Sequence, residues 1–254
     1  MKLHEHPRWL GCLLRANGAD IVCSDRLQRI IGSLADADAQ CPSLVLLVGS
    51  PHETAAVRSS FGIKRCRWPH TKHGWGDVYL YVASDLVHGG LAQLFLPLSD
   101  VVYIFCQDLG GLPGPARRLA AWMDQTASLG SRVDEPVRPE LLLVADGLPV
   151  GIASEALARQ SMLSQLRKHT TKNILDYVAA VRVLVLWPRG VLSPASRFRP
   201  LKEELLQASD RAQRRRRDAG HLFSATHFAL GPGRQSPSRS TCPVFDSMEP
   251  GACI

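Results

Sequence analysis

Five short apolar runs, separated by amphipathic stretches, constrain the fold of this chain more than any other feature. Each run is about five to seven residues long and almost continuously hydrophobic, so it lacks the alternation of a strand with one face in water. Such runs are typical of strands that are buried on both faces of a parallel sheet. The five runs cover residues 44–48, 78–83, 101–106, 141–145 and 181–187.

Helical patterns lie between several of these runs. Residues 115–127 open with a proline and carry apolar residues on one face. Residues 154–169 begin with Ser154, a suitable N-cap, and a further helix is predicted over 200–217. Because strands alternate with helices, we expect crossover connections, and therefore a doubly wound, mostly parallel α/β sheet of P-loop NTPase type.

The apolar runs and the cysteines indicate a cellular compartment. No run of about 18 apolar residues occurs, so no transmembrane segment is expected. The N-terminus has no basic start followed by an apolar stretch, which argues against a signal peptide. The seven cysteines are odd in number and scattered, a pattern that favours reduced thiols over a disulfide framework. We therefore expect a cytoplasmic protein.

The net charge of +7 belongs to one segment of the chain. Between Arg182 and Arg217 there are ten basic and three acidic residues, and the rest of the chain is balanced. The charge therefore does not indicate a dedicated nucleic-acid-binding domain.

The candidate basic patch within this segment is a run of arginines near its end. It would bind an anionic partner such as RNA, an anionic membrane or an import receptor, and its last four residues would suit nuclear import. The alternative is a solvated helix end, where the helix dipole favours cations. The patch consists of Arg211, Arg214, Arg215, Arg216 and Arg217.

The first apolar run leads into the stretch that most suggests a ligand site. In P-loop nucleotide hydrolases a strand runs into Gly, four residues and Gly-Lys-Ser/Thr; its amides and Lys hold phosphate, and the hydroxyl binds magnesium. Here Gly49 is kept, but Thr54 replaces the second Gly, and Ala55 and Ala56 replace the Lys and the hydroxyl residue. Pro51 also removes one N–H donor. A plain strand-to-helix turn without a ligand is the alternative.

Two later strand ends carry partial GTPase motifs. Asp85 and Gly89 resemble the Asp-x-x-Gly motif with one extra residue, and the run at 101–106 is similar to a GTPase strand. The fourth run ends at Asp146, without the Asn and Lys that read guanine. By order and spacing, residues 44–187 resemble a GTPase. The resemblance implies vestigial nucleotide-binding positions at Gly49, Thr54, Asp85, Gly89 and Asp146.

Four phrases make the resemblance more specific, at residues 77–81, 85–87, 197–202 and 222–228. They resemble the GTPase-like N-terminal region of large fungal patatin-like (FabD/lysophospholipase-like) proteins. That resemblance implies that a patatin-type hydrolase domain follows in a longer chain, marked by a Gly-x-Ser-x-Gly nucleophile elbow. This sequence contains no Gly-x-Ser-x-Gly. The chain would then be the N-terminal fragment of a lipid acyl hydrolase without its catalytic domain.

The division of the chain follows from these patterns. We expect a helical or irregular segment at 1–40 and a degenerate GTPase-like α/β domain at 41–229. Residues 230–254 are rich in Gly, Pro and Ser, which predicts a disordered tail.

The predicted function is that of a degenerate, non-hydrolysing, nucleotide-hydrolase-like regulatory module. Its alternatives are the hydrolase fragment and the basic-patch protein. We expect no catalytic residue, because the Lys and hydroxyl groups of phosphoryl transfer are replaced. Cys66, His70 and His73 offer three local ligands where structural zinc takes four, so no metal site is expected. No cofactor is expected either, although GTP with Mg²⁺ is the ligand that the outline would suit. The partner is unknown.

Overall fold

The chain divides into two compact units in the computed structural model. One unit comprises Met1–Pro42, Cys66–Asp77 and Arg217–Ile254, and the other comprises Ser43–Arg65 and Val78–Arg216. The residues that the structure describes are 10–15, 18–23, 32, 36, 38–41, 43–50, 57, 78–83, 99–128, 134–148 and 151–226. The predicted tail at 230–254 lies outside the described residues.

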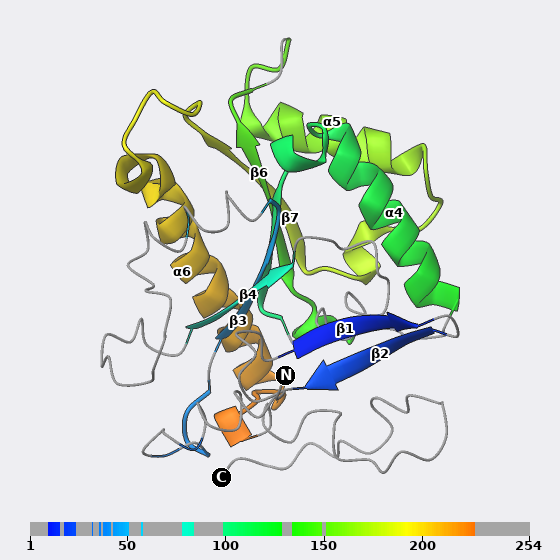
Figure 1. Cartoon of the computed structure of the whole chain (residues 1–254), viewed down its shortest axis with the longest axis vertical. Helices are drawn as coiled ribbons and strands as arrows, with labels where there is room; N and C mark the ends of the chain where they lie inside the picture. Colours follow the sequence, from blue (N-terminus) through cyan, green and yellow to red (C-terminus); the bar gives the residue numbers. More distant parts are fainter. Residues whose placement is uncertain are drawn as a thin grey trace. The chain divides into compact units, whose positions relative to one another are not determined.

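A five-stranded parallel sheet forms the centre of the larger unit (Figure 1). Its strands lie in the order β4-β3-β5-β6-β7, and every neighbouring pair is parallel. All five predicted strands are confirmed, with ends that shift by at most about one residue. Their bounds are β3 Ser43–Val48, β4 Val78–Ala83, β5 Val101–Phe105, β6 Glu140–Asp146 and β7 Ala180–Leu186.

Helices cover both faces of this sheet, as a doubly wound α/β fold requires. Helices α4 (Pro113–Ser128) and α5 (Glu155–Arg167) lie on one face, and α6 (Pro194–Asp218) lies on the other (Figure 1). Short 3-10 helices occur at η2 Gln107–Leu109, η3 Glu135–Val137 and η4 Ile174–Asp176. The predicted fold class is therefore confirmed for the described part of the chain.

The helix starts follow the capping rules, but two helices begin earlier than predicted, α4 at Pro113 instead of residue 115 and α6 at Pro194 instead of Pro200. The Ser154 hydroxyl accepts a hydrogen bond from the Leu157 N–H at 3.3 Å, as its N-cap role requires. Helix α6 begins at Pro194 and not at Pro200, which lies inside the helix. Ser193 caps this earlier start by accepting the Ser196 N–H at 3.3 Å. Proline suits the first position of a helix, so Pro194 marks the true start.

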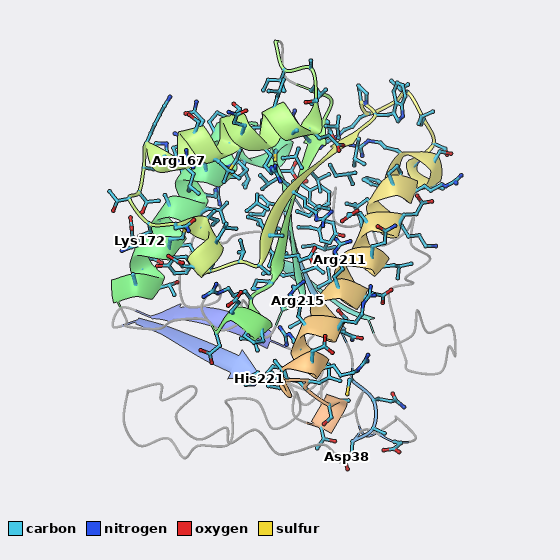
Figure 2. The ribbon with its side chains drawn as sticks, turned by 180° about the vertical axis from the view of Figure 1, so that it is seen from behind. Asp38, Arg167, Lys172, Arg211, Arg215 and His221 are labelled. Carbon is cyan, nitrogen blue, oxygen red and sulfur yellow. The ribbon has the colours of Figure 1, made fainter. Side chains whose placement is uncertain are left out.

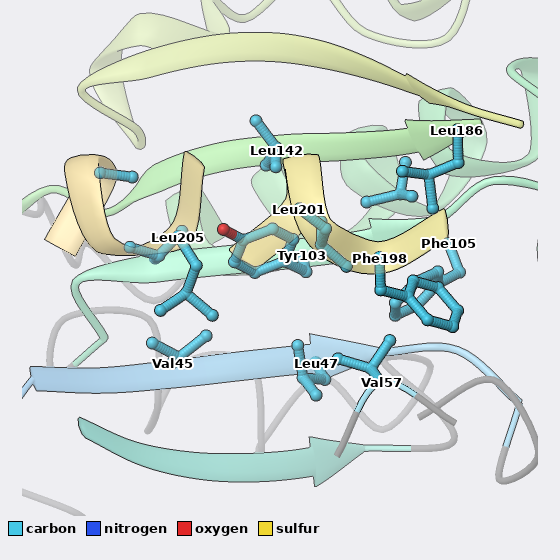
Figure 3. Close-up of a cluster of buried hydrophobic side chains, with 13 residues drawn as sticks. Val45, Leu47, Val57, Tyr103, Phe105, Leu142, Leu186, Phe198, Leu201 and Leu205 are labelled. Atoms are coloured by element: carbon cyan, nitrogen blue, oxygen red, sulfur yellow. The ribbon is translucent and has the colours of Figure 1, made fainter. Parts of the chain in front are cut away.

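The core between α6 and the sheet explains why the central strands are continuously apolar. Every residue of β3 and β5 is buried, because α6 covers one face and α4 with α5 covers the other. Figure 3 shows Phe198, Leu201 and Leu205 of α6 lying over Tyr103. The Tyr103 hydroxyl is buried without a hydrogen-bond partner among the described residues, so packing alone holds this ring.

The smaller unit contains a two-stranded antiparallel hairpin. Strand β1 covers Leu10–Arg15 and β2 covers Gly18–Cys23, with Arg15 opposite Gly18. This hairpin differs from the helical or irregular segment expected at 1–40.

We predict that Leu201→Ala lowers the free energy of unfolding by about 2–5 kcal/mol, because it leaves a cavity in a closely packed core. Leu201 is 0% exposed and lies between α6 and the sheet. The matched control is Leu206→Ala on the same helix, where the leucine is 39% exposed and the loss should be about 0.5 kcal/mol. Urea unfolding of both variants measures the difference, and equal losses would contradict the described packing of α6.

Candidate functional site

The strand order places the candidate site at the carboxyl edge of the sheet. From β3 the chain crosses to β4 on one side and later to β5 on the other, so the order reverses at β3. In open α/β sheets, ligands bind beyond the carboxyl ends of the strands at such a reversal. The described residues at this point are Gly49 and Ser50 after β3, and Asp108 after β5.

An internal carboxylate occupies the start of the loop that follows β3. The Ser50 N–H donates to Asp108 Oδ2 at 2.7 Å. Gly49 is needed for this approach, because a Cβ there would lie 2.9 Å from Asp108 Oδ2 and 2.7 Å from Phe105 Cδ2. In a phosphate-binding loop the backbone amides face the ligand. Here the Ser50 amide is instead bound to the Asp108 carboxylate of the same chain.

Local backbone geometry positions the Asp108 side chain. Asp108 lies in η2, directly after β5, and two glycines then turn the chain into α4. Gly110 and Gly111 adopt φ values of 87° and 76°, a conformation that side chains rarely tolerate. The Gly111 N–H donates to the Cys106 carbonyl at 2.8 Å and closes the turn. The turn thereby holds Asp108 next to β3.

Two arginines connect Asp108 with the end of β6. Arg189 Nη2 lies 3.5 Å from Asp108 Oδ1, and Arg189 Nε donates to Asp146 Oδ2 at 3.1 Å. Arg197 pairs with the other oxygen of Asp146 and donates to the Trp187 carbonyl at 2.8 Å. A continuous chain of contacts therefore runs from Ser50 to Arg197 along the carboxyl edge.

This edge offers charge and hydrogen bonding but little nucleophilic chemistry. Burial, followed by the charge of Asp146, raises the pKa of the neighbouring Cys106 thiol to about 12, so the thiol stays protonated at neutral pH. Among the described residues, no group of three His, Cys, Asp or Glu side chains could hold a metal ion.

The predicted nucleotide-binding positions are only partly within the described chain. Gly49 and Asp146 both lie at the carboxyl edge, where the chain of contacts through Arg189 links the loop to β6. Thr54, Asp85 and Gly89 lie outside the described residues.

The sequence patterns assigned no role in this site to Asp108, Arg189 or Arg197. The signal that could have found Arg189 is its place just after the last strand of the sheet. Carboxyl ends of parallel strands meet at one edge, so a residue after β7 can reach those after β5 and β6.

Comparison with known proteins adds little to this description. No known protein family matches the sequence, and no curated protein matches it. A solved structure of SsGBP in complex with GDP resembles the chain with 8% identity and a TM-score of 0.34. That match covers 73% of this chain and 55% of the other, so this chain spans about half the length of that protein. The patatin-like resemblance therefore rests on the sequence phrases alone. Within the described residues, no helix is long and apolar enough to span a membrane.

The predicted basic patch lies at the opposite, amino edge of the sheet, and part of it is used inside the fold. Arg211 Nη2 lies 2.8 Å from Glu140 Oε2 and 2.7 Å from Glu204 Oε1. Arg215 Nη1 donates to Glu140 Oε1 at 2.8 Å. Figure 2 shows Arg211 and Arg215 on the side of α6 that faces the sheet. Both guanidinium groups are thus paired with carboxylates, which Arg182 also contacts at 3.7 Å from Glu140 Oε2 and 3.7 Å from Glu204 Oε1.

Arg216 is the most buried member of the run, with only 3% of its side chain exposed. Its Nε lies 3.0 Å from Asp100 Oδ1, and its Nη2 donates to the Ser99 carbonyl at 2.9 Å. Asp100 Oδ2 also accepts from the Ser43 hydroxyl at 2.7 Å and the Leu44 N–H at 3.1 Å. Burial raises the pKa of Asp100, and the Arg216 charge opposes that rise.

Of the five arginines, Arg214 and Arg217 are exposed. Two acidic residues, Asp210 and Asp218, are exposed on the same part of α6. The surface that the run presents to solvent is therefore much less basic than the sequence suggests. Binding of an anionic partner through this surface stays a prediction.

We predict that the arginines divide into two groups with different effects on folding. Arg211→Gln with Arg215→Gln should lower the free energy of unfolding by about 3 kcal/mol, because the buried Glu140 carboxylate loses the hydrogen bonds from both arginines and keeps only the 3.7 Å contact with Arg182. The matched variant Arg214→Gln with Arg217→Gln removes the same charge and should change stability by about 0.5 kcal/mol. Thermal and urea unfolding compare the two.

The exposed-pair variant also tests the basic patch without disturbing the fold. If its retention on RNA and on anionic liposomes equals that of the wild type, the patch hypothesis fails. A strong, salt-dependent loss of retention would support the hypothesis.

We predict that Glu140→Gln destabilises the protein in a pH-dependent way. Burial alone would raise the pKa of Glu140, but hydrogen bonds from Arg211 and Arg215 outweigh burial and hold this pKa below its ordinary value of 4.5. A lowered carboxyl pKa contributes stability that is present above the ordinary value and is lost as the pH falls through the lowered one. The variant should therefore lose about 3 kcal/mol at pH 7 and clearly less at pH 3.

Unfolding measured at both pH values checks this. Glu203→Gln is the control, because Glu203 is exposed and pairs only with the exposed Arg199 among the interactions described. That variant should lose at most about 0.5 kcal/mol at either pH. A loss for Glu140→Gln that is independent of pH would contradict the assignment.

Proposed function

We propose that the carboxyl edge is the ligand site of a nucleotide-hydrolase-like module that no longer hydrolyses. The doubly wound strand order supports a site at this edge, because it places Gly49, Asp108 and Asp146 beyond the strand ends at the reversal point. The module then signals by being occupied or empty, and not by turning over its ligand. We call this role regulatory in that sense.

The observation that carries the proposal is the hydrogen bond between the Ser50 N–H and Asp108 Oδ2, at 2.7 Å. A loop that was used for phosphoryl transfer would direct this amide toward phosphate. Here a fixed negative charge lies beside the loop, and it disfavours a second anion at the same place. Ala55 and Ala56 further remove the groups that neutralise phosphate and hold magnesium.

The chemistry of the remaining groups supports loss of hydrolysis. Arginines can stabilise the charge that develops in phosphoryl transfer. Both arginines at this edge are already paired with carboxylates, Arg189 with Asp108 and Asp146, and Arg197 with Asp146. Among the described residues of this edge, the two arginines are therefore balanced by the two carboxylates.

We predict that the wild-type chain binds GTP with Mg²⁺ weakly and releases no phosphate from it. Calorimetry should give a dissociation constant above the micromolar range, which corresponds to binding weaker than about −8 kcal/mol. A phosphate-release assay on the same sample should stay at the level of buffer. Sub-micromolar binding, or release above that background, would overturn the proposal that the module has lost hydrolysis.

A further inference from the structure

The carboxyl edge contains a negatively charged group in the position where a ligand anion would bind. Asp108 is only 12% exposed, and one of its oxygens is directed at the Ser50 amide. The neighbouring Gly49 has no side chain, so the backbone approaches this oxygen closely. Successive backbone N–H groups in a turn can form a concavity that binds an anion, and here the Ser50 N–H holds the Asp108 carboxylate.

The charges around Asp108 balance, but the contacts are unequal. Arg197 is only 5% exposed and is held by both Asp146 and the Trp187 carbonyl. Arg189 is 50% exposed and is shared between two carboxylates. Its 3.5 Å contact with Asp108 is longer than the roughly 2.7–2.9 Å of a strong charge-assisted hydrogen bond. The Arg197 side chain is therefore held in place, and the Arg189 side chain is the one that can change partners.

We propose that Asp108 is an internal competitor for an oxyanion site. Its carboxylate occupies the place of the ligand's phosphate group, bound to the Ser50 N–H and close to the Arg189 guanidinium. A phosphate group binds when Asp108 is displaced, and the same amide and the same arginine then hold it. The ligand class is a phosphate group, either free or part of a nucleotide. This inference rests on the proposed function, since it concerns the same site.

The inference follows from the balance of charge at the edge. Asp108 and Asp146 offset Arg189 and Arg197, so these four described residues present no net positive charge to a dianionic phosphate. Removing the Asp108 carboxylate leaves one surplus positive charge, vacates the Ser50 amide and removes a like charge at contact distance. Charges at such distances in a partly buried site interact strongly. Affinity for phosphate should then rise.

The test compares phosphate binding by wild type, Asp108→Ala and a matched control. The control is Asp176→Ala, which removes an exposed carboxylate from another 3-10 helix and so makes the same change of net charge. Calorimetry with inorganic phosphate, and separately with GTP and Mg²⁺, gives the affinities. Asp108→Ala should bind phosphate at least about tenfold more tightly than wild type, and Asp176→Ala should match wild type.

A second variant tests the role of Arg189. In Asp108→Ala combined with Arg189→Gln, the gained affinity should be lost, because the guanidinium group that contacts the anion is removed. An equal gain in Asp108→Ala and Asp176→Ala would overturn the inference, since net charge alone would explain it. No gain in Asp108→Ala with either probe, or a gain that survives Arg189→Gln, would overturn it as well.

The two probes distinguish the source of the phosphate. A gain with inorganic phosphate means that the phosphate group suffices, and a gain with GTP alone means that the nucleotide is needed. If Asp108→Ala does not fold by circular dichroism, Asp108→Asn replaces it under the same criteria, because it removes the charge and keeps the shape. The proposed function fails on wild-type hydrolysis or tight binding, whereas this inference fails on the difference between variant and wild type.

Discussion

The contact between helix α6 and the sheet is the one on which the rest of the structure depends. A parallel sheet must be covered on both faces, and α6 is the helix that covers the face formed by Tyr103 and its neighbours. The first half of α6 is held by apolar packing, and its second half by carboxylates at Glu140 and Asp100. A buried charge is costly unless it is paired. Asp100 and Arg216 therefore depend on each other, and the position of the helix depends on both.

Both edges of the sheet carry ion pairs between arginines and carboxylates. At the amino edge, these pairs join α6 to the starts of β5 and β6, and Arg216 is almost fully buried. Arg182 at the same edge is 45% exposed and shared between Glu140 and Glu204. At the carboxyl edge, Arg189 is half exposed and shared between Asp108 and Asp146. The proposed ligand site is at the carboxyl edge because the strand order reverses there.

The fold could be predicted from the sequence because its signals are local. Continuous apolar runs reveal doubly buried strands, and Ser154 reveals a helix start, without knowledge of any distant residue. The hairpin at Leu10–Cys23 was missed, because its strands do not alternate clearly between apolar and polar residues. The start of α6 was misplaced because Pro200 was taken as a helix start and lies within the helix.

The sites could not be predicted in the same way, because their partners are far apart in sequence. Arg215 pairs with Glu140, 75 residues away, and Ser50 binds Asp108, 58 residues away. A run of arginines looks the same in sequence whether solvent or carboxylates surround it. Only the register of strands and helices decides this. The missing Lys of the loop, in contrast, was visible in the sequence at once, since a motif is defined by spacing alone.

Helix α6 also connects the carboxyl edge of the sheet with its amino edge. Its 25 residues span about 37 Å. Arg197, near one end, contacts Asp146 at the carboxyl edge, and Arg216, near the other end, contacts Asp100 at the amino edge. A displacement of Asp146 would therefore act on the same helix that Asp100 holds near its other end. A packed helix that contacts two distant points is one kind of element through which they can be coupled. Pro200 lies between Arg197 and Arg216 and removes one backbone hydrogen bond from the helix. Bending of α6 is therefore easiest in its first turns, near the carboxyl edge of the sheet.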